Sequence, residues 1–100
     1  MKVTNFTSNK GNKVPNQYLI TIGNLEIFQS YNSIIAIKDG DKVRLNYVYW
    51  DWSRTTLKYL NQFLGTSGKK EILRNLKFSR GKWQTDHHIE DYFNVTLNTK

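Results

Sequence analysis

The residues best suited to chemistry are two adjacent histidines near the C-terminus, His87 and His88, which have acidic neighbours. Imidazole and carboxylate groups are common ligands of transition metals such as Zn²⁺. Adjacent residues of a strand point to opposite faces, however, so these two histidines are poorly placed to share one ion. We therefore expect no metal and no cofactor, and we interpret the segment as an exposed polar lead into a strand.

Catalytic motifs give no stronger signal. The sequence contains no GxSxG elbow, P-loop, HExxH pair or dinucleotide-binding fingerprint. Asp39-Gly40-Asp41 resembles the start of a calcium loop, but the acidic residue required later in such a loop is missing, so the segment predicts a hairpin turn. A small metal-dependent nuclease that uses His87 or His88 with Lys82 is a third hypothesis. The sequence favours a binding protein over an enzyme.

Positive charge is concentrated in one part of the chain. Residues 54–82 hold eight Lys/Arg and one Glu, a surplus of seven that equals the net charge of +7 of the whole 100-residue chain. Such a surplus favours contact with nucleic acid, a ribonucleoprotein or an acidic protein surface. The expected contact residues, which include two aromatic anchors, are Arg54, Lys58, Tyr59, Lys69, Lys70, Arg74, Lys77, Arg80, Lys82 and Trp83.

The alternative for this segment is a solvated helix face, with its aromatic rings in the core. One of Trp50 and Trp52 is expected in the core and the other outside. No helix-turn-helix spacing, RNP sequence, GXXG loop or zinc-finger pattern accompanies the charge. Direct nucleic-acid binding is therefore predicted from charge alone.

The elements that must position these residues are predicted from apolar periodicity. Alternating segments separated by turn residues predict a four-stranded antiparallel meander over about residues 17–49. Ser53 is the expected N-cap of a helix that Gly65 ends, and a second helix is expected over about residues 69–78. Residues 92–97 are rich in β-formers and are the candidate for a last strand. We expect an α+β fold, a four- to five-stranded antiparallel sheet (meander) covered on one face by two short helices.

The expected domain organisation is a flexible N-terminal arm, residues 1–16, followed by a single α+β domain, residues 17–100. Within the arm, Val3 and Phe6 are the candidates for a short edge strand. The chain has no cysteine, no signal-peptide pattern and no run long enough to span a membrane, which favours the cytoplasm. We expect a monomer, or a weak homodimer through a sheet edge.

Two segments carry a more specific signal, FQSYxSxIA at residues 28–36 and WDxSxTTxKY at residues 50–59. Together with the strand at residues 16–20 and SxGKW at residues 79–83, they resemble a family of small uncharacterised proteins from phages and plasmids of Gram-positive bacteria. The tail at residues 84–100 departs from that family. No activity follows from the resemblance, which implies only a mobile-element accessory protein in a bacterial host cell.

Small accessory proteins of mobile elements often act by binding. We therefore expect a stoichiometric inhibitor of a host defence nuclease, similar to anti-CRISPR proteins that block a Cas9-type effector, bound through the basic helical segment. A basic protein cannot mimic DNA, so it would contact guide RNA or an acidic patch of the nuclease. The alternative is a sequence-tolerant DNA- or RNA-binding accessory protein.

Overall fold

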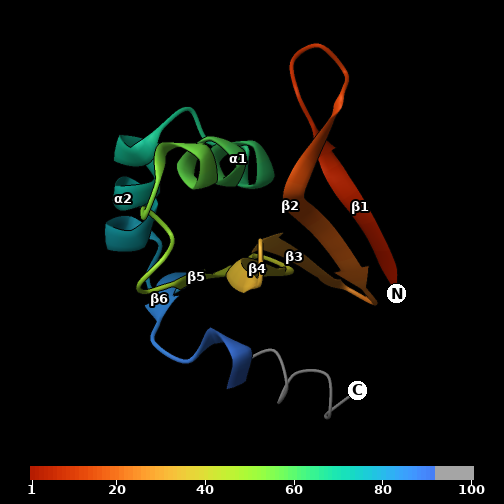
Figure 1. The fold of residues 1–100 in the computed structure, drawn as a ribbon. Helices are drawn as coiled ribbons and strands as arrows, with labels where there is room; N and C mark the ends of the chain where they lie inside the picture. Colours follow the sequence, from red (N-terminus) through yellow and green to blue (C-terminus); the bar gives the residue numbers. More distant parts are fainter. Residues whose placement is uncertain (92–100) are drawn as a thin grey trace.

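The computed structural model describes residues 1–91, which form a six-stranded sheet and its helices (Figure 1). The strands lie side by side in chain order; β1 to β5 form an antiparallel meander, and β6 pairs parallel to β5. The bounds of the elements are β1 Lys2–Thr7, β2 Lys13–Ile22, β3 Leu25–Ser30, β4 Ser33–Asp39, β5 Lys42–Asn46, α1 Arg54–Leu64, α2 Lys69–Phe78 and β6 Trp83–Asp86.

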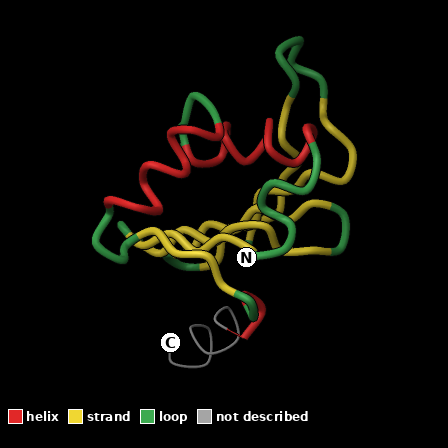
Figure 2. Tube along the Cα trace, turned by 90° about the vertical axis from the view of Figure 1, so that its left-hand side faces the viewer, coloured by secondary structure: helices red, strands yellow, loops and turns green. Residues whose placement is uncertain are grey.

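Both helices lie on the same face of the sheet (Figures 1 and 2). The predicted α+β class and the helical cover of one face are therefore confirmed. The sheet has more strands than the four or five expected, and it is mixed. Parallel neighbours require a long crossover connection, and here α1 and α2 supply it between β5 and β6.

The N-terminal segment is a correction to the prediction. Residues 1–16, expected as a flexible arm, contain β1 and the start of β2, which pair antiparallel. Phe6 explains why this segment forms a strand, because its ring is buried against Phe28 and Tyr59 at centroid distances of 5.1 and 5.8 Å. A single aromatic side chain thus anchors an otherwise polar strand.

The helix ends follow the expected chemistry. The N-cap Ser53 accepts a hydrogen bond from the Thr56 N–H at 3.1 Å, and α1 ends at Gly65, whose φ is 72°. At α2 the carboxylate of Glu71 turns back to Ser67 and accepts from its N–H at 2.7 Å and its hydroxyl at 2.8 Å. Both predicted helices are confirmed, with bounds close to those expected.

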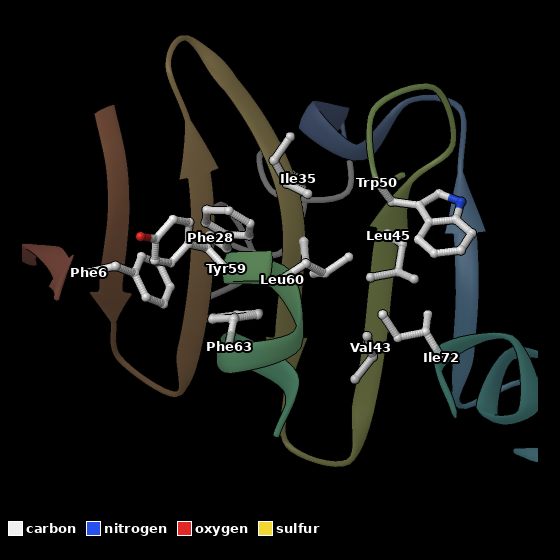
Figure 3. Close-up of a cluster of buried hydrophobic side chains, with 11 residues drawn as sticks. Phe6, Phe28, Ile35, Val43, Leu45, Trp50, Tyr59, Leu60, Phe63 and Ile72 are labelled. Carbon is white, nitrogen blue, oxygen red and sulfur yellow. The ribbon is translucent and has the colours of Figure 1, made fainter. Parts of the chain in front are cut away.

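The main core lies between the helices and the sheet. Leu60 and Phe63 of α1 and Ile72 of α2 pack over Phe28 of β3 and Leu45 of β5 (Figure 3). A second cluster lies on the other face of the sheet, and its buried members are Leu25, Ile27, Ile37 and Ile89. The expected last strand at residues 92–97 lies outside the described residues. No helix within residues 1–91 is long and apolar enough to cross a membrane.

Candidate functional site

Three exposed positive charges lie on one face of α2. Lys70, Arg74 and Lys77, which we call the basic face, are all exposed. Successive helix residues are rotated by about 100°, so these three fall on the side opposite the buried Ile72. Within the described residues, none of the three forms a salt bridge. The structure thus directs these three side chains outward.

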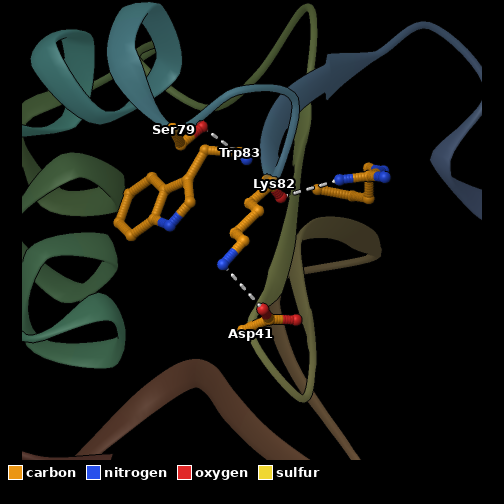
Figure 4. Close-up of polar contacts among 5 residues, drawn as sticks. Asp41, Ser79, Lys82 and Trp83 are labelled. Atoms are coloured by element: carbon orange, nitrogen blue, oxygen red, sulfur yellow. Dashed lines mark hydrogen bonds and ion pairs between the residues drawn. The ribbon is translucent and has the colours of Figure 1, made fainter.

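Two of the predicted contact lysines have other roles. Lys69 Nζ lies 3.1 Å from Asp51 Oδ2, which ties the start of α2 to the loop before α1. Lys82 Nζ lies 3.1 Å from Asp41 Oδ2, across the β4–β5 turn (Figure 4). A hydrogen bond from Lys82 and its positive charge lower the pKa of the exposed Asp41 carboxyl. Partial neutralisation makes Lys69 and Lys82 weaker anion contacts than the basic face.

The one acidic residue of α2 neutralises the basic face only in part. The Glu71 carboxylate is engaged by the Ser67 N–H and hydroxyl, and these hydrogen bonds, followed by the charge of Arg74, lower the pKa of Glu71. The Glu71 charge thus mainly serves the helix N-terminus, where a negative group is stabilised. Lys70 and Lys77 remain open to an external anion, and Arg74 is the cation that Glu71 partly offsets.

The remaining predicted cations lie elsewhere. Arg54 and Lys58 are exposed residues of α1, and Lys58 Nζ lies 5.4 Å from the centroid of the Tyr59 ring. Arg80 is exposed in the turn after α2, with a positive φ of 56°. The predicted set is thus divided between α1, α2 and the turn that follows, and only α2 presents three cations on one helix face.

The two aromatic anchors expected from the sequence are not available. Tyr59 is only 5% exposed and packs against Phe6. Trp83 is half-buried, packs against the main core and donates its backbone N–H to the Ser79 hydroxyl at 2.8 Å (Figure 4). Both rings belong to the fold, because their strand and helix positions face the core.

Two apolar residues that the sequence did not assign to the surface flank the basic face. Leu73 is 46% exposed and Phe78 is 69% exposed. Lys77 Nζ lies 5.3 Å from the centroid of the Phe78 ring. On a helical wheel, Leu73 and Phe78 lie on either side of Lys70 and Arg74. This position was the signal in the sequence that could have identified both residues as exposed.

A second exposed feature lies where the β3–β4 turn meets the loop before α1. Here Tyr31 and Trp52 are 63% and 70% exposed, whereas Trp50 is buried, as the predicted division of the two tryptophans required. The rings of Tyr49 and Trp52 meet edge to face, with centroids 5.5 Å apart. A cleft of about 260 Å³, which we call the aromatic cleft, is lined by Ser30, Tyr31, Ser33, Ile35, Tyr49, Trp52, Ser53 and Thr56.

The histidines lie in the turn after β6, and both are exposed. His87 stacks on Tyr47 with ring centroids 3.8 Å apart, and the His88 N–H donates to Asp86 Oδ1 at 2.8 Å. Among residues 1–91, no three or more His, Cys, Asp or Glu side chains are grouped so that they could hold a metal ion. The contacts of this segment are therefore those of a surface turn.

Comparison with known proteins gives one finding. The model of a family of unknown function, DUF8033, matches residues 1–80. The match spans β1 to α2, and so includes the basic face and the aromatic cleft. No curated protein and no solved structure matches the chain.

Proposed function

The chain belongs to this family of unknown function, and we propose that it is a stoichiometric inhibitor of a host defence nuclease that docks through the basic face of α2. The observation that carries the proposal is the division of charge on the helical layer. Lys69 and Lys82 are paired with carboxylates, whereas Lys70, Arg74 and Lys77 project outward and form no salt bridge in the described part of the chain. Glu71 interacts with Arg74 only through its charge, because its carboxylate is held by Ser67.

The surroundings of these cations suit a macromolecular partner. The exposed Leu73 and Phe78 lie on the same outward side of α2 and can exclude water around the charges. A surface that combines three cations with apolar groups fits a partner with both phosphates and protein, such as the ribonucleoprotein of a Cas9-type effector in a bacterial cytoplasm. The contacted group would be guide RNA or an acidic patch of the nuclease.

The proposal is tested by a cleavage assay at increasing molar ratios of the protein to the nuclease complex. We expect inhibition to reach its limit near equimolar protein and to be lost in the Lys70→Glu, Arg74→Glu, Lys77→Glu variant. A matched variant reverses Lys2, Lys10 and Lys13, which are exposed on β1, β2 and their connection, and changes the net charge by the same amount. Full inhibition by the α2 variant, or equal loss in both variants, would contradict a role for the basic face.

A second candidate function is direct, sequence-tolerant binding of DNA or RNA. The exposed rings of Tyr31 and Trp52 favour it, because an exposed ring can stack on an unpaired base. Gel-shift titration at two salt concentrations distinguishes the functions. Strong, salt-sensitive binding to naked nucleic acid without nuclease inhibition supports the second function, and nuclease inhibition near equimolar protein supports the first.

A further inference from the structure

We propose that the aromatic cleft binds an unpaired nucleobase of single-stranded nucleic acid. The inference deepens the proposed function, because it names the chemical group of a ribonucleoprotein that this protein would contact. It depends on Tyr31 of the β3–β4 turn and on Tyr49 and Trp52 of the loop before α1, which together line one cleft.

The exposure of these rings has no explanation in the fold. Trp52 is the most exposed of the three tryptophans, and its ring is supported from one side by Tyr49, at 5.5 Å and an interplanar angle of 72°. An indole that is held in this way presents a flat apolar surface to solvent, which is the surface on which a base stacks. The same rings do not contribute to either buried cluster.

Tyr31 is held in a strained conformation at the edge of the cleft. Its φ is +54°, which is unusual for a bulky residue. Two hydrogen bonds fix it, from its own N–H to the Asn16 carbonyl at 2.7 Å and from Gln29 Nε2 to its carbonyl at 2.8 Å. Strained residues are concentrated at binding sites. Glycine or asparagine would avoid the backbone strain at this position. The chain instead has Tyr31 there, whose ring is exposed.

The size and polarity of the cleft select the ligand. Its volume of about 260 Å³ lies just below the roughly 300–1,000 Å³ of pockets for drug-sized molecules, so it suits one planar ring system. Apolar lining from Ile35 lies beside the hydroxyls of Ser30 and Ser33. A nucleobase offers both an apolar face and polar edges that match this lining.

Charge complementarity favours a nucleotide over an apolar peptide side chain. Arg54 directly follows Ser53 of the cleft, is exposed, and forms no ion pair within residues 1–91. The nearby Asp51 carboxylate is already paired with Lys69. The phosphate attached to a bound base would therefore lie near the Arg54 cation rather than near a free carboxylate. The net charge of +7 of the chain also attracts phosphate.

The test measures binding of fluorescently labelled oligoadenylate, as RNA and as DNA, to the full chain by anisotropy. We expect Trp52→Ala to weaken binding about 5- to 100-fold, as for the loss of one base–aromatic stack, and Trp52→Phe to restore most of it. Phe78→Ala is the matched control, because Phe78 is as exposed as Trp52 but lies on α2 outside the cleft. Bound oligonucleotide should also shield Trp52 from acrylamide quenching. Whichever of the RNA and DNA strands shows the Trp52 effect is the source of the base.

Three results would overturn the inference. The first is wild-type affinity of Trp52→Ala for both strands. The second is an equal loss on duplex of the same sequence, where no base is unpaired. The third is shielding of Trp52 by rising protein concentration alone, which would mean that a second copy of the chain fills the cleft. A basic-face variant with wild-type oligonucleotide binding but no nuclease inhibition would leave the inference standing, so the two proposals fail separately.

Discussion

The number of phosphates that the basic face contacts sets how steeply binding weakens with salt. Each contact adds about 0.7 to the slope of log affinity against log salt on a single strand. If Lys70, Arg74 and Lys77 each contact one phosphate, the face adds about 2 to that slope. Raising the salt from about 50 to about 200 mM should then weaken these contacts about 20-fold. The variant Lys70→Gln, Arg74→Gln, Lys77→Gln should show a slope smaller by about 2.

The assay is anisotropy of labelled oligoadenylate at four or more salt concentrations, with the slope as the readout. The control variant replaces Lys2, Lys10 and Lys13 by Gln, which removes the same charge from an exposed region outside the helices. We expect its slope to match the wild type. If the α2 variant keeps the wild-type slope, the basic face makes no phosphate contacts. If both variants lose the same slope, binding depends on overall charge and the reasoning from the spacing of the three residues is refuted.

Three further predictions concern stability. Ile72→Ala should lower the free energy of unfolding by about 2–5 kcal/mol, because Ile72 is fully buried. The control Leu73→Ala on the same helix should change the free energy of unfolding by less than about 1 kcal/mol, and urea titration measures both. Tyr31→Gly should raise the unfolding free energy by about 1 kcal/mol by relieving its positive φ, while it weakens oligonucleotide binding; a stability loss would argue against strain. Asp41 and Glu71 have lowered pKa values in the folded state, so their stabilisation is fully present above their unfolded values near 4. It is lost as the pH falls from there through the lower folded values, so Asp41→Asn with Glu71→Gln should flatten the acid side of a thermal-melting profile.

The meander and the helices could be predicted because their signals are local. Alternation defines β2 to β5, and Ser53 and Gly65 mark the ends of α1 through their own backbone chemistry. β1 was predicted only as a candidate edge strand within a flexible arm, since its stability depends on one residue, Phe6, whose partners are distant in sequence. β6 is only four residues long, too short for a periodic pattern, and its pairing depends on the return of the chain through two helices.

The candidate site likewise has one part that local sequence signals predict and one part that only the folded chain creates. The basic face was predictable, because the spacing of Lys70, Arg74 and Lys77 alone places them on one side of a helix. The ion pairs of Lys69 and Lys82 were not, because each joins residues that only the folded chain brings together. Counting charges by segment therefore included two lysines that the fold pairs with carboxylates.

The aromatic cleft also could not be predicted from the sequence, although most of its residues lie in the two motifs. The resemblance to the family rests on FQSYxSxIA and WDxSxTTxKY, and these two segments supply every lining residue of the cleft except Tyr49. The fold needs the buried members of these motifs, such as Phe28 and Trp50, which belong to the main core. It does not need a strained Tyr31, or the exposed indole of Trp52, which stands at an unspecified position of the second motif. Core packing accounts for the buried members of the motifs, and the bound ring that we propose at the cleft would give the exposed Tyr31 a physical role.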